Sequence, residues 1–179
     1  MLGLSGSGKT RLAARIVAAR PDFLKLSAGR LLREALHTTG RALRTAPSEE
    51  VLENQRRLVQ VLQHARAGRE GQPVLLEAHA FVDNDRELID VPVDVMRAMD
   101  VSGLLVLVAS PEIIHNRRVT DLRRRRPHRT VDDLSRQQEH MLELARKYAS
   151  GLPAEIAVVE SGDLPAALRF LDHFRSPSR

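Results

Sequence analysis

The chain has 179 residues, a length that fits one domain with a sizeable core and excludes two large domains. It contains no cysteine, so disulfides, thiolate metal sites and cysteine nucleophiles are excluded together. Aromatic residues make up 3%, which leaves aliphatic side chains to fill the core and few rings to stack on single-stranded bases. The net charge is +5, but residues 117–130 alone hold seven arginines against one aspartate, so the positive excess is local.

The sequence contains no stretch of about 18 or more consecutive apolar residues. Its first residues lack the charged region, apolar run and cleavage site of a secretory signal. We therefore expect a cytoplasmic protein without a membrane partner. No internal repeat or linker divides the chain, so we expect a single domain over residues 1–174 and a disordered polar tail over residues 175–179.

Apolar periodicity predicts helices that alternate with short buried strands. In the first half of the chain, the expected elements are a helix after residue 9 that stops before Pro21, a strand over 23–26, a helix after the cap residue Ser27, a helix over 48–67 and a strand over 74–76. In the second half, they are a helix over 93–99, a strand over 104–108, a helix from Pro111, a helix over 131–148, a strand over 156–159 and a helix over 164–174. Residues 38–48, with Gly40 and Pro47, are expected to form an exposed loop, and residues 84–92 an irregular segment. This alternation predicts an α/β fold whose parallel sheet is covered on both faces.

Residues 3–10, Gly-Leu-Ser-Gly-Ser-Gly-Lys-Thr, match the phosphate-binding loop pattern Gly-x-x-x-x-Gly-Lys-Thr. The glycines let the backbone point successive N–H groups at an anion, and the following helix directs its positive end at the same place. Lys9 can reach the β- and γ-phosphates of ATP, and the Thr10 hydroxyl can bind Mg²⁺. The predicted nucleotide-binding residues are Gly3, Ser5, Gly6, Ser7, Gly8, Lys9 and Thr10.

This motif predicts a three-layer P-loop NTPase fold with about five parallel strands. The alternative is a glycine-rich turn that happens to precede Lys-Thr, and the helical pattern after the motif argues against it. Only Met1 and Leu2 precede Gly3, whereas such a loop normally follows a strand of about five residues. We favour a start codon placed downstream of the natural one, and we expect that added apolar residues upstream would raise stability.

Three further segments resemble archaeal-type adenylate kinases. Residues 27–33, Ser-Ala-Gly-Arg-Leu-Leu-Arg, look like the Ser-Thr-Gly-Asp-Met-Leu-Arg segment that opens the monophosphate site in adenylate kinases. Residues 77–79, Glu-Ala-His, resemble the Asp-x-His signature of the archaeal type, and residues 117–136 match the lid region in spacing. The resemblance covers nearly the whole chain, with two departures: Ala28 replaces the usual threonine and Glu77 the usual aspartate.

The resemblance implies that Arg33 grips the phosphate of the acceptor. The implied acceptor-binding residues are Ser27, Gly29, Arg33 and His79. Glu77, an acidic residue at the end of an apolar strand, would hold Mg²⁺ together with Thr10. Read without the resemblance, Arg33 could be an exposed helix residue, Glu77 a strand-end carboxylate and His79 a structural histidine, and these alternatives stay open.

An arginine-rich flap suits phosphoryl transfer, because two anionic substrates must be held together while water is kept out. Arginine binds phosphate oxygens bidentately and keeps its proton at neutral pH. The predicted catalytic residues are Lys9, Arg118, Arg124 and Arg126, of which the three arginines match lid positions of the family. The assignment within the run 123–126 stays open, since an alignment can slip by one residue. A solvated helix face and an RNA site are the alternatives for this cluster.

The sequence thus predicts a nucleoside monophosphate kinase that moves the γ-phosphoryl group of ATP to AMP or a related monophosphate, with ATP and Mg²⁺ as cofactors. No general base is required, because a phosphate acceptor is already ionised. One alternative is a P-loop kinase of another small acceptor, such as a sugar. Another is a regulatory or RNA-associated ATPase. The pair Asp132 and Asp133 is expected to flank the start of the helix after the flap.

Overall fold

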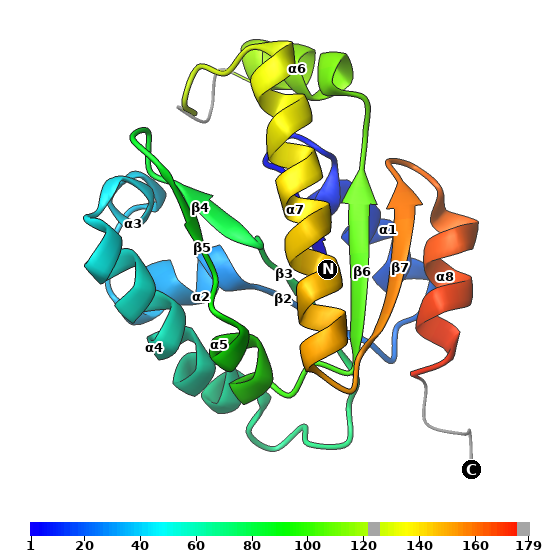
Figure 1. Ribbon diagram of the computed structural model, residues 1–179. Coiled ribbons are helices and arrows are strands. Elements are labelled where there is room, and N and C mark those ends of the chain that lie inside the picture. Colours follow the sequence, from blue (N-terminus) through cyan, green and yellow to red (C-terminus); the bar gives the residue numbers. More distant parts are fainter. Residues whose placement is uncertain (122–125, 175–179) are drawn as a thin grey trace.

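The computed structural model describes residues 1–121 and 126–174. Its centre is a layer of parallel strands with helices on both sides (Figure 1). One parallel sheet contains β1 (Leu2–Gly3), β6 (Gly103–Val108) and β7 (Glu155–Glu160). A second contains β2 (Leu24–Ser27) and β3 (Val74–Glu77), also parallel.

Met1 joins these two sheets. Its amino nitrogen donates a hydrogen bond to the Leu76 carbonyl at 2.7 Å, and the Ala78 N–H donates to the Met1 carbonyl at 3.0 Å. The two partners of Met1, Leu76 and Ala78, are the residues directly before and after Glu77. Bonding to both neighbours of one residue is the pattern of parallel pairing. The strands therefore lie in the order β2-β3-β1-β6-β7, and the expected parallel sheet of about five strands is confirmed.

The helices cover both faces of this layer. They are α1 (Lys9–Ala19), α2 (Ala28–Ala35), α3 (Gly40–Thr45), α4 (Ser48–Arg66), α5 (Val93–Ala98), α6 (Pro111–Thr120), α7 (Val131–Gly151) and α8 (Leu164–Asp172). Local signals explain where α7 begins: the Thr130 hydroxyl accepts from the Asp133 N–H, and the Asp133 carboxylate accepts from the Thr130 N–H. Asp133 thus flanks this helix as expected. In the described part of the chain, no helix is both long and apolar enough to cross a bilayer.

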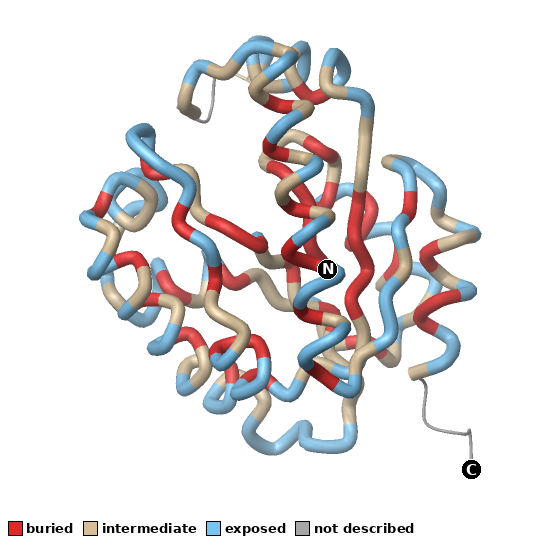
Figure 2. Tube along the Cα trace, viewed as in Figure 1, coloured by how far each residue is buried: buried red, intermediate tan, exposed pale blue. Residues whose placement is uncertain are grey.

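The alternation of side chains along β6 divides the core in two. Leu104 and Val106 belong to a cluster with apolar residues of α4, α5 and α7. Leu105 and Leu107 belong to a cluster with residues of α1 and α8 on the other face. Successive strand residues point to opposite faces, so the four buried central residues of one strand supply both clusters. Figure 2 shows this burial along β6.

The prediction of a loop over residues 38–48 is wrong in part, because this segment contains the helix α3. The Thr39 hydroxyl accepts a hydrogen bond from the Ala42 N–H at 3.1 Å and caps this helix. Pro47 lies after its end, where the residue before a proline is disfavoured in a helix. The cap residue was the local signal, and Gly40 and Pro47 obscured it.

Residues 84–92 are also more regular than expected. β4 (Phe81–Asp83) and β5 (Leu88–Asp90) pair antiparallel. The Asn84 side-chain oxygen accepts from the N–H groups of Arg86 and Glu87 at 3.0 and 2.9 Å and shapes the turn between them. Strands of three residues are too short to show a period of two, so only the turn chemistry pointed to this hairpin.

Ser27 occupies the N-cap position of α2 with an extended backbone, as the sequence predicts. Its hydroxyl makes no capping hydrogen bond, so the expected cap is right in position and wrong in mechanism. The backbone of Ser27 is extended, as in β2, and α2 begins at the next residue without a capping hydrogen bond from the Ser27 side chain.

Candidate functional site

The phosphate-loop motif connects β1 to α1 at the edge of the sheet where the parallel strands end. Gly6 and Gly8 have φ angles of +94° and +99°, a region that glycine enters at no steric cost. A Cβ at Gly3 would lie 2.8 Å from Ser7 Oγ and 3.0 Å from the Leu107 carbonyl oxygen. The curled loop therefore depends on glycine at these three positions.

Lys9 lies buried inside the loop. Its Nζ donates to the carbonyl oxygens of Gly3 at 2.5 Å and Leu4 at 3.0 Å. Ser7 Oγ is enclosed as well and has no hydrogen-bond partner within the described part of the chain. An ammonium group, a hydroxyl group and backbone N–H groups at a helix N-terminus together favour a bound phosphate.

Thr10 and Glu77 meet next to the loop. The Thr10 hydroxyl donates to Glu77 Oε2 at 2.8 Å, and Lys25 Nζ lies 4.0 Å from Glu77 Oε1. Hydroxyl and carboxylate oxygens fit Mg²⁺, which takes hard oxygen ligands and leaves other positions to water and substrate phosphates. No group of three or more His, Asp or Glu suited to a metal occurs within residues 1–121 and 126–174.

Two neighbouring arginines of α6 hold the phosphate loop from outside. Arg117 Nη1 donates to the Ser7 carbonyl and to Ser161 Oγ, both at 3.1 Å. Arg118 Nε donates to the Ser5 carbonyl at 2.8 Å. Burial, and after it the charge of Arg126, lowers the pKa of Arg118 to about 10. Arg118 therefore stays protonated at neutral pH, and a bound anion would offset the repulsion from Arg126.

Arg126 reaches the same loop from the segment before α7. Its Nε donates to Ser5 Oγ at 3.0 Å, and its Nη2 donates to Asp121 Oδ2 at 2.5 Å. Its Nη1 is enclosed and has no hydrogen-bond partner in residues 1–121 and 126–174. A buried guanidinium nitrogen without an acceptor is unfavourable unless a ligand supplies one, so this donor also indicates an anion.

A cavity of about 250 Å³ opens beside the phosphate loop. Its apolar lining includes Leu32 of α2, Leu43 of α3 and Phe81 of β4. Four guanidinium groups also line it, those of Arg33, Arg44, Arg118 and Arg126. An apolar wall combined with several cations suits an organic anion.

Asp83, at the end of β4, also lines this cavity. Among the described lining residues, it is the one with a carboxylate side chain. Its Oδ1 accepts from Arg129 Nη2 at 2.8 Å, and its Oδ2 accepts from Arg129 Nε and Gln137 Nε2, both at 3.0 Å. The guanidinium group of Arg129 thus binds this carboxylate in bidentate geometry. This network ties β4 to the segment between α6 and α7.

The structure brings most of the predicted site residues together. Gly29, Arg33 and His79 line the cavity, whereas Ser27 is not among its lining residues. Arg33 is exposed, and its guanidinium group lies next to Gly29, where a Cβ atom would be 3.7 Å from Arg33 Nη1. Arg124 lies outside the described residues.

Sequence reasoning missed other residues of the site, among them Arg44, Asn54, Asp83, Arg117 and Gln137. Arg117 belongs to the arginine cluster, so charge alone pointed to it. Asp83 and Arg44 lie in the hairpin and the helix that were expected to be irregular.

A glycine-rich phosphate loop between a strand and a helix of a parallel α/β sheet defines a P-loop nucleotide-binding protein. Residues 2–135 match the profile of a family described as AAA domain. This match covers well over half of the chain, and the protein belongs to that family.

Comparison with individual proteins gives adenylate kinases and a shikimate kinase. The chain is 30% identical over 91 residues to an adenylate kinase of Pyrococcus abyssi (50% of this chain, 46% of that protein), so it spans about half the length of that relative. It is 27% identical over 172 residues to an adenylate kinase of Thermococcus onnurineus (89% of this chain, 83% of that protein). A shikimate kinase structure from Bacteroides thetaiotaomicron aligns with a TM-score of 0.52 and 13% identity over 97% of this chain and 95% of that one. The P-loop fold and the resemblance to adenylate kinases are therefore confirmed.

Proposed function

We propose that the protein is a nucleoside monophosphate kinase that transfers the γ-phosphoryl group of ATP to AMP or a related monophosphate. The observation that carries this proposal is the cavity beside the phosphate loop, with four guanidinium groups in its lining. Similarity to adenylate kinases supports the same activity.

The phosphate loop would hold the donor. Lys9 and the loop N–H groups bind the β- and γ-phosphates, and the hydroxyl of Ser7 gains the partner that it lacks. Thr10 and Glu77 would hold Mg²⁺, which neutralises charge on the phosphates. Arg118 and Arg126 lie between the loop and the cavity, where they would stabilise the charge on the transferring group.

The cavity favours a phosphate acceptor over a hydroxyl acceptor. A hydroxyl group needs a general base to take its proton, whereas a phosphate oxygen is ionised at neutral pH. Asp83 accepts hydrogen bonds from Arg129 and Gln137 through both of its carboxylate oxygens, so both oxygens are already occupied as acceptors. Arg33 and Arg44 would instead bind the anionic acceptor.

The test is transfer of labelled phosphate from ATP to a panel of nucleoside monophosphates, with shikimate and a simple sugar as hydroxyl acceptors. We expect product from at least one monophosphate and none from the hydroxyl acceptors. Lys9→Ala should lower turnover by roughly 10²-fold or more, because positioning and charge supply nearly all of the catalysis.

Lys147→Ala is the matched control, since Lys147 is exposed on α7 and lies outside the cavity lining. It should leave turnover unchanged. Transfer to a hydroxyl acceptor alone, or full turnover in Lys9→Ala, would contradict the proposal.

A further inference from the structure

The inner face of α4 carries one polar residue among apolar ones. The buried positions of this helix are Val51, Asn54, Leu58 and Leu62, a spacing that defines a single helix face. Asn54 is 4% exposed, and its Nδ2 atom is enclosed without a hydrogen-bond partner among the residues that the structure describes. A buried amide without a partner destabilises a fold, so folding alone would favour leucine at this position.

Asn54 also lines the cavity beside the phosphate loop. It comes from α4, which packs against α2 and α3, on the left of Figure 1, whereas α6 lies at the top. Arg118 and Arg126 are bonded to Ser5 at the loop. The cavity therefore has a cationic end at the loop and an apolar end, formed by helices, to which α4 contributes the amides of Asn54 and Gln55. Of these two amides, Asn54 is the buried one.

We propose that Asn54 selects the nucleobase of the acceptor at this apolar end. The inference rests on the proposed function and deepens it. The flat faces of a base would pack between the side chains of Leu32, Leu43 and Phe81, and the edge of the base would accept the hydrogen bond that Asn54 lacks.

The chemistry of the amide favours adenine. A side-chain amide offers a donor beside an acceptor, which complements the adjacent donor and acceptor on an adenine edge. The N7 and O6 atoms of guanine both accept and suit a guanidinium group instead. With the edge that carries N7 facing Asn54, AMP is preferred to GMP, and Asn54 determines that preference.

Asn54→Leu tests this, because it removes the amide and keeps the size of the side chain. We expect a melting temperature equal to or above that of the wild type, since an unpaired buried polar group is lost. The KM for AMP should rise at least about tenfold and the preference for AMP over GMP should fall, because the base loses its partner. The KM for ATP should stay unchanged.

Gln60→Leu makes the same chemical change at an exposed position of the same helix and should alter none of these values. Asn54→Asp, which keeps the shape and cannot donate, serves if Asn54→Leu does not fold, and it should raise the KM for AMP in the same way. A fall in melting temperature with an unchanged KM and an unchanged base preference would overturn the proposal.

Calorimetric binding of AMP and GMP separates this inference from the proposed function. If the wild type binds AMP and Asn54→Leu binds it at least about tenfold more weakly, the inference stands even if no phosphoryl transfer is seen. If the wild type transfers phosphate but both proteins bind AMP equally, the inference fails alone. If the folded wild type binds neither nucleotide, both fail.

Discussion

At the residue scale, the site gathers charged groups that the fold removes from water. Lys9 and Glu77 are both buried, and the Met1 ammonium lies between β3 and β6. Burial, and after it the charge of Lys9, lowers the pKa of this ammonium from 8.0 to about 5, while Glu77 acts in the opposite direction. The neutral amine is therefore the form that the folded state prefers.

This shift predicts that stability rises with pH between about 5 and 8. Below pH 5 both states hold the proton, and the folded state carries the whole cost of burying a charge. Between the two pKa values the unfolded chain binds more protons, so the free energy of unfolding increases with pH. Three pKa units correspond to roughly 4 kcal/mol.

Urea unfolding at pH 5, 6.5 and 8 measures this increase. The matched control is the same chain with an acetylated amino terminus, which has no proton to lose at Met1. The difference between the two chains should depend on pH as described, and a constant difference would show that the ammonium does not titrate in this way.

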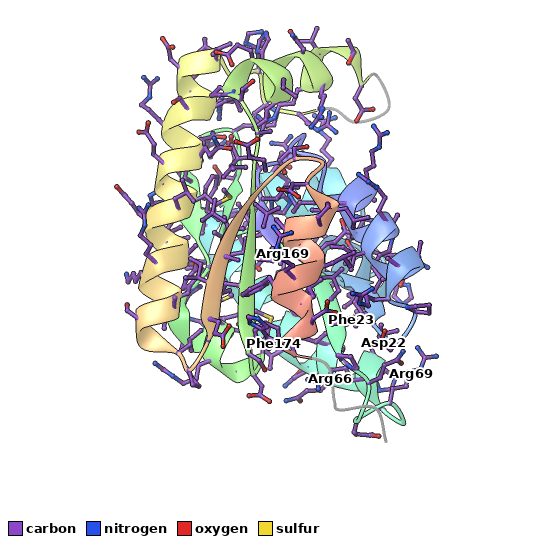
Figure 3. All side chains as sticks on the ribbon, turned by 90° about the vertical axis from the view of Figure 1, so that its right-hand side faces the viewer. Asp22, Phe23, Arg66, Arg69, Arg169 and Phe174 are labelled. Atoms are coloured by element: carbon purple, nitrogen blue, oxygen red, sulfur yellow. The ribbon has the colours of Figure 1, made fainter. Side chains whose placement is uncertain are left out.

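At the scale of elements, β1 is the shortest strand of the parallel sheet. A cavity of about 240 Å³ lies between β3 and β6 next to Met1, and its lining includes Phe23, Arg66 and Phe174, which Figure 3 labels. Residues of both neighbouring strands line this cavity. It has the position that a longer β1 would occupy.

We therefore expect that three or four apolar residues added before Met1 will raise the melting temperature. They would pair with β3 and β6 and bury side chains worth about 1.5–3 kcal/mol each before the cost of ordering the chain. A Gly-Ser extension of the same length is the control and should stabilise less. Equal melting temperatures for the original chain and the apolar extension would refute the prediction.

Tyr148 of α7 anchors the hairpin of β4 and β5. Its hydroxyl oxygen lies 3.0 Å from the carbonyl oxygen of Ala80 and 2.6 Å from that of Val91, so the two carbonyls share its single proton; burial raises the pKa of its phenol. Tyr148→Phe should lower the free energy of unfolding by about 1–3 kcal/mol, because two buried carbonyl groups lose their shared donor. Chemical denaturation measures the change, and wild-type stability in this variant would show that the two carbonyls find other partners.

At the scale of the whole molecule, positive charge gathers around the cavity and its rim. Arg41, Arg44, Arg126, His128 and Arg129 line a second, more open depression next to it. Such a surface could serve an RNA backbone, and salt separates the two functions. RNA binding through 6–10 phosphates should weaken by about 10³-fold or more between 50 and 200 mM salt.

We expect transfer of phosphate to AMP to change far less over this range, because the arginines at the loop are partly enclosed and therefore less screened. Turnover and RNA binding measured in the same buffers test this. Strong RNA binding at 200 mM salt, together with ATP hydrolysis and no transfer to AMP, would favour the RNA-associated ATPase.

The sequence by itself determined the phosphate loop, the alternation of strands and helices and the parallel sheet. These features rest on local spacing: glycines where φ is positive at Gly6 and Gly8, and apolar runs such as residues 104–108, which β6 buries on both faces. Thr10 and Glu77 were also both predicted to bind Mg²⁺, Thr10 from the phosphate-loop motif and Glu77 as the acidic residue that ends an apolar strand, and their side chains are hydrogen-bonded to each other.

Only the tertiary structure decided the acceptor side of the cavity. Asp83, Arg129 and Gln137 meet through contacts between segments 46 and 54 residues apart, and local spacing does not encode such distances. The hairpin of β4 and β5 and the helix α3 were missed because short elements draw their stability from packing rather than from propensity. Asn54 shows the same limit: its place in an apolar stripe is visible in the sequence, but only the folded cavity shows what its amide faces.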